Sequence, residues 1–234
     1  MKISCNLLAA GAASLLLVAC KPAETQQAQV QPMAAPVPAP PSKSLKVIHP
    51  GPFGTQQGMT LKELETTIAL TKSKEFFYTS GDAPAPNGDF TAYGYWITPE
   101  HGLCKVTGIS DAIKTNVFGE QLRDKYGAVK GALVEKYAKP SFDKDYVERG
   151  SIWTDPQDFM AGLQKQDRAL GASWYAHGPD IPAKRSVKLP PGLSMIELDA
   201  MADGHSDGKL VLAYSFENND KCLEVMKAAK NKSL

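Results

Sequence analysis

The first 44 residues of the 234-residue chain cannot contribute to a folded core, which restricts folding to residues 45–234. Lys2 precedes an apolar run at 7–19 that is interrupted by Ser14. A run of roughly 13 residues is too short to span a membrane and is typical of a signal peptide. The segment after it is rich in Pro, Ala and Gln and has little to bury, so it cannot offset its own ordering entropy. The sequence therefore predicts a signal peptide at 1–19, a solvated linker at 20–44 and one globular domain at 45–234.

The apolar run ends in Leu17-Val18-Ala19-Cys20, which resembles the lipobox of bacterial lipoproteins. In that family the cysteine is acylated and the signal is cut off just before it. The resemblance implies a lipid on Cys20 and a tether of about 3.1 Å per residue, with a full reach on the order of 70 Å. Lys21 is not the aspartate associated with inner-membrane retention in enteric lipoproteins, so the resemblance implies attachment to the outer membrane, facing the periplasm. An ordinary secretory signal with a chance cysteine is the alternative.

The cysteine count then predicts one disulfide. Cys5 would leave with the signal peptide and Cys20 would carry the lipid, so Cys104 and Cys222 remain as an even pair in an oxidising compartment. Closing a loop of this length contributes roughly 4–5 kcal/mol in the chain-entropy model. A reactive or metal-binding thiol is the alternative, although no third ligand has the spacing of a zinc site.

Hydrophobic periodicity predicts helices that alternate with antiparallel hairpins. Thr60 and Glu63 have the spacing of a capping box that begins a helix. A second helix, ending before Pro140, is indicated by a stripe of Leu122, Tyr126, Val129, Leu133 and Tyr137. Further helices are predicted to begin at Asp155 and Asp220. Strands are predicted at 76–79, 90–98, 104–109, 146–153, 172–177, 193–201 and 210–216.

This mixture predicts an α+β domain, an antiparallel sheet with helices packed on one face, in which a helix–hairpin unit is doubled. The first helix start, Gly58-Met59-Thr60, resembles the opening of small envelope lipoproteins of the BamE type, and tandem copies of such a unit occur in β-lactamase-inhibitor-like proteins. Gly-Leu-Cys-Lys at 102–105 and Gly-Ser-Ile-Trp at 150–153 resemble segments of uncharacterised proteobacterial lipoproteins. That family brings no known activity.

Charge and motif content exclude several classes of function. The formal net charge of +1 provides no field that would favour nucleic acid. The chain shows no phosphate-binding loop or hydrolase motif, so we expect no cofactor. The carboxylates of the loop at 203–208 lack the ordered spacing of a calcium site and fit a polar hairpin turn. The histidines occur singly, without the spacing of a metal site; they are His49, His101, His177 and His205.

Aromatic side chains concentrate in the predicted strands, and they include Tyr93, Tyr95, Trp96, Trp153, Trp174, Tyr175 and Tyr214. In a sheet covered by helices on one face, one set of these would point away from the core and mark a partner surface. The candidate binding surface is Tyr93, Tyr95, Trp153, Trp174 and Tyr214. The alternative is that most of them are core, because the strand at 90–97 is apolar on both sides.

The sequence therefore predicts a membrane-anchored periplasmic lipoprotein that binds an envelope protein without catalysis, as an inhibitor, immunity protein or envelope-assembly accessory. A passive structural lipoprotein fits the same features. The other alternative is an envelope hydrolase acting on peptidoglycan, lipid or glycan. It predicts a deep pocket in which His177, Asp180 or another titratable group converges with polar partners. The sequence leaves the oligomeric state open.

Overall fold

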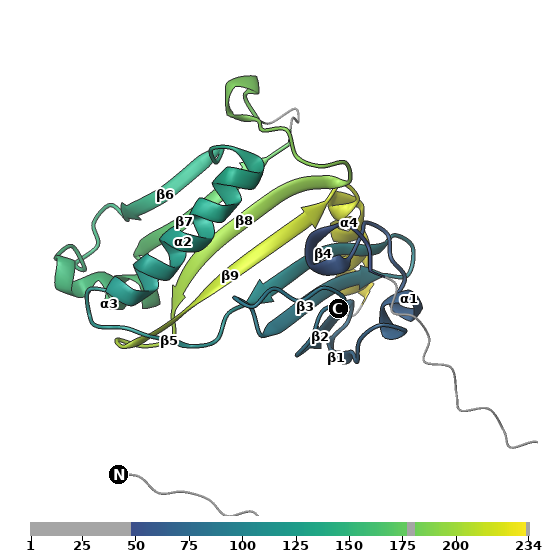
Figure 1. Cartoon of the computed structure of the whole chain (residues 1–234), viewed down its shortest axis with the longest axis horizontal. Helices are drawn as coiled ribbons and strands as arrows, with labels where there is room; N and C mark the ends of the chain where they lie inside the picture. The colour runs from purple at the N-terminus through teal and green to yellow at the C-terminus, as the bar shows by residue number, and fades with distance from the viewer. Residues whose placement is uncertain (1–47, 177–180, 233–234) are drawn as a thin grey trace, which may run out of the picture. The chain divides into compact units, whose positions relative to one another are not determined.

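The computed structural model describes residues 48–176 and 181–232 (Figure 1). The predicted signal peptide, Cys20, the linker, His177 and Asp180 lie outside the described residues. The described chain forms a nine-stranded antiparallel sheet with four α-helices, which confirms the predicted α+β class. Within these residues, no helix combines the length and the apolar character that a membrane span requires.

The sheet consists of two four-stranded meanders that are joined edge to edge. The first contains β1 (Thr71–Lys74), β2 (Phe77–Ser80), β3 (Ala92–Thr98) and β4 (Gly102–Ile109). The second contains β6 (Phe142–Val147), β7 (Arg168–Tyr175), β8 (Leu193–Ala202) and β9 (Asp207–Phe216). The strand order is β1-β2-β3-β4-β9-β8-β7-β6, and the short β5 (Ile113–Lys114) pairs with β9.

A doubled unit is visible in this topology. Each meander comes after a helix, α1 (Leu61–Glu65) in the first half and α2 (Glu120–Tyr137) in the second. The last strand of each meander, β4 or β9, pairs antiparallel with its counterpart, as a two-fold relation between the halves requires. The repeated unit is a helix with four strands, which is longer than the predicted helix–hairpin.

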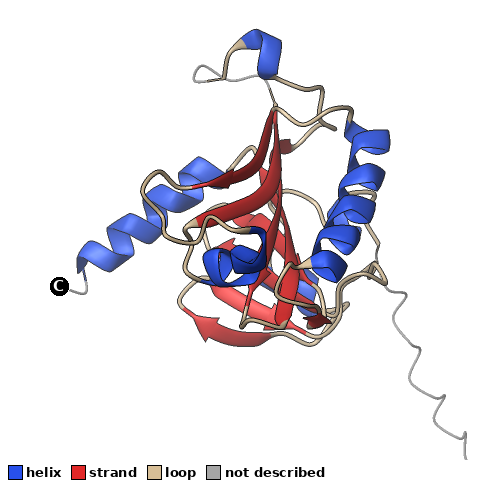
Figure 2. Ribbon diagram, turned by 90° about the vertical axis from the view of Figure 1, so that its left-hand side faces the viewer, coloured by secondary structure: helices blue, strands red, loops and turns tan. Residues whose placement is uncertain are grey.

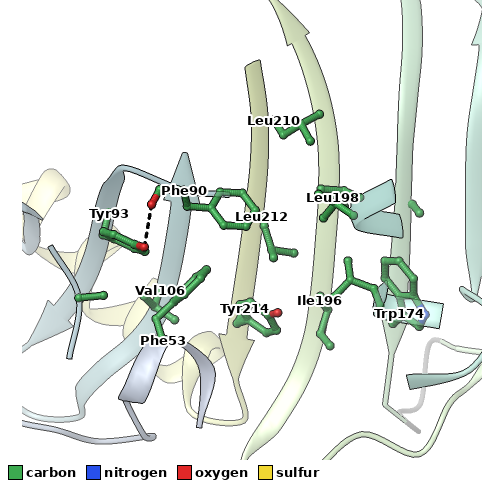
Figure 3. Packing of buried hydrophobic residues seen from close by; sticks show 14 of the residues in the cluster. Phe53, Phe90, Tyr93, Val106, Trp174, Ile196, Leu198, Leu210, Leu212 and Tyr214 are labelled. Atoms are coloured by element: carbon green, nitrogen blue, oxygen red, sulfur yellow. Dashed lines mark hydrogen bonds between the residues drawn. The ribbon is translucent and has the colours of Figure 1, made fainter. Parts of the chain in front are cut away.

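The core lies on the face of the sheet that α2 covers. All five residues of the predicted helical stripe are buried in α2. Val106, Tyr214, Ile196 and Trp174 are consecutive partners across β4, β9, β8 and β7, so their side chains point to this same face. Figure 3 shows these residues within one continuous hydrophobic cluster. The two meanders therefore share one core.

The last helix does not share that face. Figure 2 shows α2 and α4 (Asn219–Lys232) on opposite sides of the sheet. Leu223 and Met226 of α4 lie beside Trp96 and Met195, whose side chains point away from the core. The expectation that all helices pack on one face is therefore not confirmed. The chain crosses to the other side of the sheet after β9. In the first turn of α4, Cys222 then forms a disulfide with Cys104 of β4.

The sequence predicts the start of α1 correctly, because side chains there bond backbone groups three residues away. Thr60 and Glu63 form the predicted capping box at α1. The predicted strand at 146–153 is wrong, because the chain turns at Gly150, whose φ is +88°, and β6 ends before it. The Asp155 side chain makes no capping hydrogen bond, and a 3₁₀ turn at Pro156–Asp158 leads into the short α3 (Phe159–Gln164).

Candidate binding face

Four of the five candidate aromatic residues lie in the core. Tyr93, Tyr95, Trp174 and Tyr214 are at most 7 % exposed, so the prediction that they form a partner surface is wrong and the alternative holds. Figure 3 shows Tyr93, Trp174 and Tyr214 within the hydrophobic cluster. The pairing register places all four on the face that α2 covers. The fifth residue, Trp153, is half-buried in the loop after β6 and is not in a strand.

Hydrogen bonds at the polar ends of these side chains explain how they are accommodated in the core. The Tyr93 hydroxyl donates to the Phe90 carbonyl at 2.9 Å, and the Tyr95 hydroxyl to the Asp82 carbonyl at 3.1 Å. The Trp174 indole N–H donates to the carbonyl of Ala138, the residue that caps α2, at 2.8 Å. Buried Tyr and Trp need such partners, so these residues have a structural role.

The opposite side of the sheet is hollowed and partly exposed. We call it the open face and define it by ten residues from five strands: Phe77, Gly94, Trp96, Lys105, Thr107, Ile109, Glu197, Asp199, Val211 and Ala213. All of them except Gly94 and Ala213 are half-buried. They line a hollow of about 300 Å³. Beyond this set, Met201 and Tyr146 point to the same side and are 44 and 48 % exposed.

An aromatic pair forms one end of the open face. The rings of Phe77 and Trp96 lie 4.5 Å apart, tilted by 36°. Gly94 allows this arrangement, because a Cβ there would lie 2.9 Å from a ring carbon of Phe77. The Phe77 ring can therefore lie over the backbone of β3, and the pair presents a partly exposed apolar surface to solvent.

Two ion pairs cross the middle of this side of the sheet. Lys105 Nζ lies 3.5 Å from Glu197 Oε2, and Lys144 Nζ lies 3.7 Å from Asp199 Oδ1. The side chains of the first pair are 28 and 24 % exposed. Both signs of charge therefore lie close to apolar groups, as at the polar rim of a protein interface.

Asp199 is the carboxylate whose environment is most perturbed on this face. Burial raises its pKa above the ordinary value, and the nearby Glu197 acts in the same direction. The ammonium of Lys144 acts against this rise without cancelling it. Gly171, directly opposite, leaves room for the Asp199 carboxylate against the sheet, since a Cβ there would contact it. The fold thus keeps a partly desolvated carboxylate on a face that is open to a partner.

A second hollow continues the open face underneath α4. Its volume is about 320 Å³, and its lining is Trp96, Lys105, Met195, Ser215, Asn219, Leu223 and Met226. Trp96 and Lys105 line both hollows, so the two are adjacent. The sulfur atoms of two methionines make its wall adaptable to different occupants.

The predicted disulfide is present and holds α4 over this hollow. Cys104 in β4 pairs with Cys222, and their Cα atoms lie 6.4 Å apart. Cys222 is the buried residue of α4. The bridge therefore ties the first turn of α4 to β4.

The described titratable groups do not gather into a metal centre. His49 and His101 are half-buried and His205 is exposed, and none of the three lines either hollow. Among residues 48–176 and 181–232, no three His, Cys, Asp or Glu side chains are arranged to hold a metal ion. The carboxylates that share a hollow are Glu197 and Asp199.

Another cavity lies away from the open face. It measures about 580 Å³ and lies between the prolines at 50 and 52, those at 190 and 191, and the end of α2. Lys136 is its charged lining residue, and the other walls are mainly carbon and glutamine amides. This arrangement provides little chemistry for specific recognition, so we regard the open face as the better candidate site.

The sequence carries a signal for the open face, although Trp96 is not among the five predicted surface residues. Trp96 was among the strand aromatics, and strict alternation places it opposite to Tyr93 and Tyr95. Gly94, on the same side as Trp96, marks a strand position where a side chain from a neighbouring strand can lie over the backbone.

Comparisons with known proteins add no relative. No family model, no curated protein and no solved structure matches the chain.

Proposed function

We propose that this protein is a lipid-anchored envelope protein whose open face binds another protein of the cell envelope. The open face is the observation that carries the proposal: a hollowed sheet surface with a half-buried aromatic pair and paired charges. Interfaces are enriched in aromatic residues and methionine at the centre and carry charges at the rim. The lipobox resemblance of Cys20 supports placing this surface in the periplasm.

The geometry favours a partner that presents a projecting loop. The open face and the space under α4 are concave, with hollows of about 300 and 320 Å³, so a flat partner would leave both unfilled. A loop with an apolar side chain at its tip would cover Trp96 and Phe77. Charged groups beside the tip would meet the Lys105–Glu197 and Lys144–Asp199 ion pairs.

A photo-crosslinking experiment tests the proposal. A photoreactive amino acid at Val211, in the centre of the open face, is expected to give a discrete adduct with one envelope protein in living cells. The same amino acid at Thr71, on exposed edge strand β1, serves as the control and should give none. A second substitution, Thr107→Arg, places a long cation in the hollow and should abolish the Val211 adduct, whereas Thr71→Arg should not.

Two results would contradict the proposal. One is the absence of any Val211 adduct in cells that export the protein. The other is an adduct of equal yield in the Thr107→Arg variant, which would show that the captured protein does not occupy the hollow.

One observation favours the envelope hydrolase as a second candidate. Glu197 and Asp199 lie two residues apart on β8 and share a hollow with Trp96, and the pKa of Asp199 is raised by burial. Two carboxylates with different environments, beside an aromatic ring, resemble the acid–base pair of a glycoside hydrolase. Release of sugar fragments from peptidoglycan by the wild type, and its loss in Asp199→Asn and Glu197→Gln, would support this candidate over the binding module.

A further inference from the structure

The hollow under α4 contains a buried hydroxyl without a partner. Ser215 is 1 % exposed, and its Oγ makes no hydrogen bond in the described structure. Ser215 is the direct register partner of both Lys105 and Met195, so its side chain points away from the core and into this hollow. A buried hydroxyl that lacks a partner is unfavourable, and it therefore marks a place where a ligand group can bond.

The rest of the lining favours a ligand that is mainly apolar. Trp96, Met195, Leu223 and Met226 form most of the lining, beside the polar Lys105, Ser215 and Asn219. Leu223 is 43 % exposed, so the hollow opens towards solvent on the α4 side. Methionine sulfur and an indole ring both contact aromatic rings favourably, which favours an aromatic occupant over a plain aliphatic one.

The charges of the hollow favour a neutral polar group over an ionised one. Lys105 is already paired with Glu197 at 3.5 Å. An added carboxylate would lie close to Glu197, and an added ammonium would lie close to Lys105. A neutral hydroxyl avoids both repulsions and can still bond Ser215.

From these three features we propose that the hollow under α4 is a subsite for a phenol group, and that the protein partner anchors itself there with a tyrosine side chain. The ring would lie against Trp96 and Met226, and its hydroxyl would bond Ser215 Oγ. A phenylalanine would fill the same space but leave Ser215 without a partner, so the subsite distinguishes the two side chains by one hydrogen bond. The identity of the occupant as a protein side chain rests on the proposed function.

The test uses p-cresol, which is the side chain of tyrosine, and toluene, which is that of phenylalanine. Binding is followed by the NMR shift of the Trp96 indole in the chain from residue 20, with Cys20→Ser to keep it free of lipid. We expect p-cresol to shift the Trp96 signal. In Ser215→Ala the affinity for p-cresol should fall about fivefold, the value of one neutral hydrogen bond, while the affinity for toluene should stay within about twofold.

Two tryptophan variants serve as a matched pair. Met226→Trp fills the hollow and should abolish binding of both probes. Ala228→Trp adds the same bulk to an exposed position of α4 and should leave binding unchanged. Ser215→Ala should also keep or raise the denaturation midpoint, because it removes an unbonded hydroxyl. A purely structural role for Ser215 would lower it.

The possible failures are separable. If p-cresol leaves the Trp96 signal unmoved, binds equally well to Ser215→Ala, or still binds to Met226→Trp, the phenol subsite is wrong even when the Val211 adduct forms. If p-cresol binds as expected but no Val211 adduct forms, the subsite stands and the protein-binding function is wrong.

Discussion

Asp199 lines the open face, and its partial burial is expected to lower the free energy of unfolding at neutral pH. Its carboxylate is partly buried, and the pKa rises because burial outweighs the attraction of Lys144. An acid whose pKa is raised by folding holds its proton more tightly in the native state. Tighter proton binding in the folded state adds to the free energy of unfolding. This gain is complete below the pKa of the unfolded state and is lost as the pH rises through the pKa of the folded state.

Asp199→Asn should consequently raise the free energy of unfolding at pH 7. Because the side chain is 41 % exposed, solvent screening limits the gain to less than about 1 kcal/mol. The gain should vanish below pH 3.8, the ordinary pKa, where aspartic acid is also neutral. Urea unfolding of both proteins at pH 7 and in acid measures the difference. A variant less stable than the wild type at pH 7 would show that the Lys144 pair dominates.

Thr60 provides the clearest local stability test. Its side chain accepts from the Glu63 N–H at 3.2 Å, and the Glu63 carboxylate accepts from the Thr60 N–H at 2.8 Å. Thr60→Ala should lower the free energy of unfolding by about 1 kcal/mol, as at other helix caps. Lys62→Ala, an exposed change in the same helix, should stay within about 0.5 kcal/mol. Equal effects of the two changes in denaturant unfolding would contradict the role of the capping box.

At the scale of elements, the edges of the sheet are less suited to a partner than its open face. Edge strand β1 has the sequence TKSK and is exposed throughout. Edge strand β6 carries three charged residues of alternating sign at 143–145. Charged edge strands, lysines especially, protect a sheet from pairing with another chain. Strand addition is therefore disfavoured at both ends, while the aromatic pair lies on the face between them.

The disulfide is expected to control the position of α4. Replacing Cys104 and Cys222 by serine removes a bridge across 118 residues and should lower stability by up to roughly 4–5 kcal/mol in the chain-entropy model. Hydrogen exchange should quicken more in α4 than in β9, because Cys222 is the buried residue of the helix. Unchanged protection of α4 in the double variant would show that Leu223 and Met226 hold it without the bridge.

At the scale of the whole molecule, the proposed function depends on a membrane anchor that places the open face at the envelope. The lipid on Cys20 stays a prediction, because that residue lies outside the described part of the chain. Cys20→Ser should abolish incorporation of labelled palmitate and release the protein from membranes. Cys5→Ser, a change within the predicted signal peptide, should leave labelling intact. Equal labelling of the Cys20→Ser variant, or recovery of the uncleaved chain from the cytoplasm, would refute the prediction.

The sequence was sufficient wherever neighbouring residues decide the structure. The stripe from Leu122 to Tyr137 determined α2, since residues three or four apart share a helix face. Strands β3, β4, β8 and β9 were predictable from alternation and from turn residues close in the chain. The pairing of Cys104 with Cys222 was predictable from the count of cysteines outside the predicted signal peptide and lipidation site. By contrast, β1 was missed because four polar residues carry no hydrophobic pattern.

The tertiary structure alone decided which side of the sheet is exposed. The strand from Tyr93 to Ile97 is apolar on both sides, so its sequence is compatible with either orientation. The choice is made by the pairing of β4 with β9, which joins Lys105 to Ser215 across more than a hundred residues, and by α2, which covers one side. Tyr93, Tyr95 and Tyr214 thereby enter the core, and Trp96 joins the open face. Such long-range pairing depends on the packing of all strands together, and no local stretch of the chain encodes it.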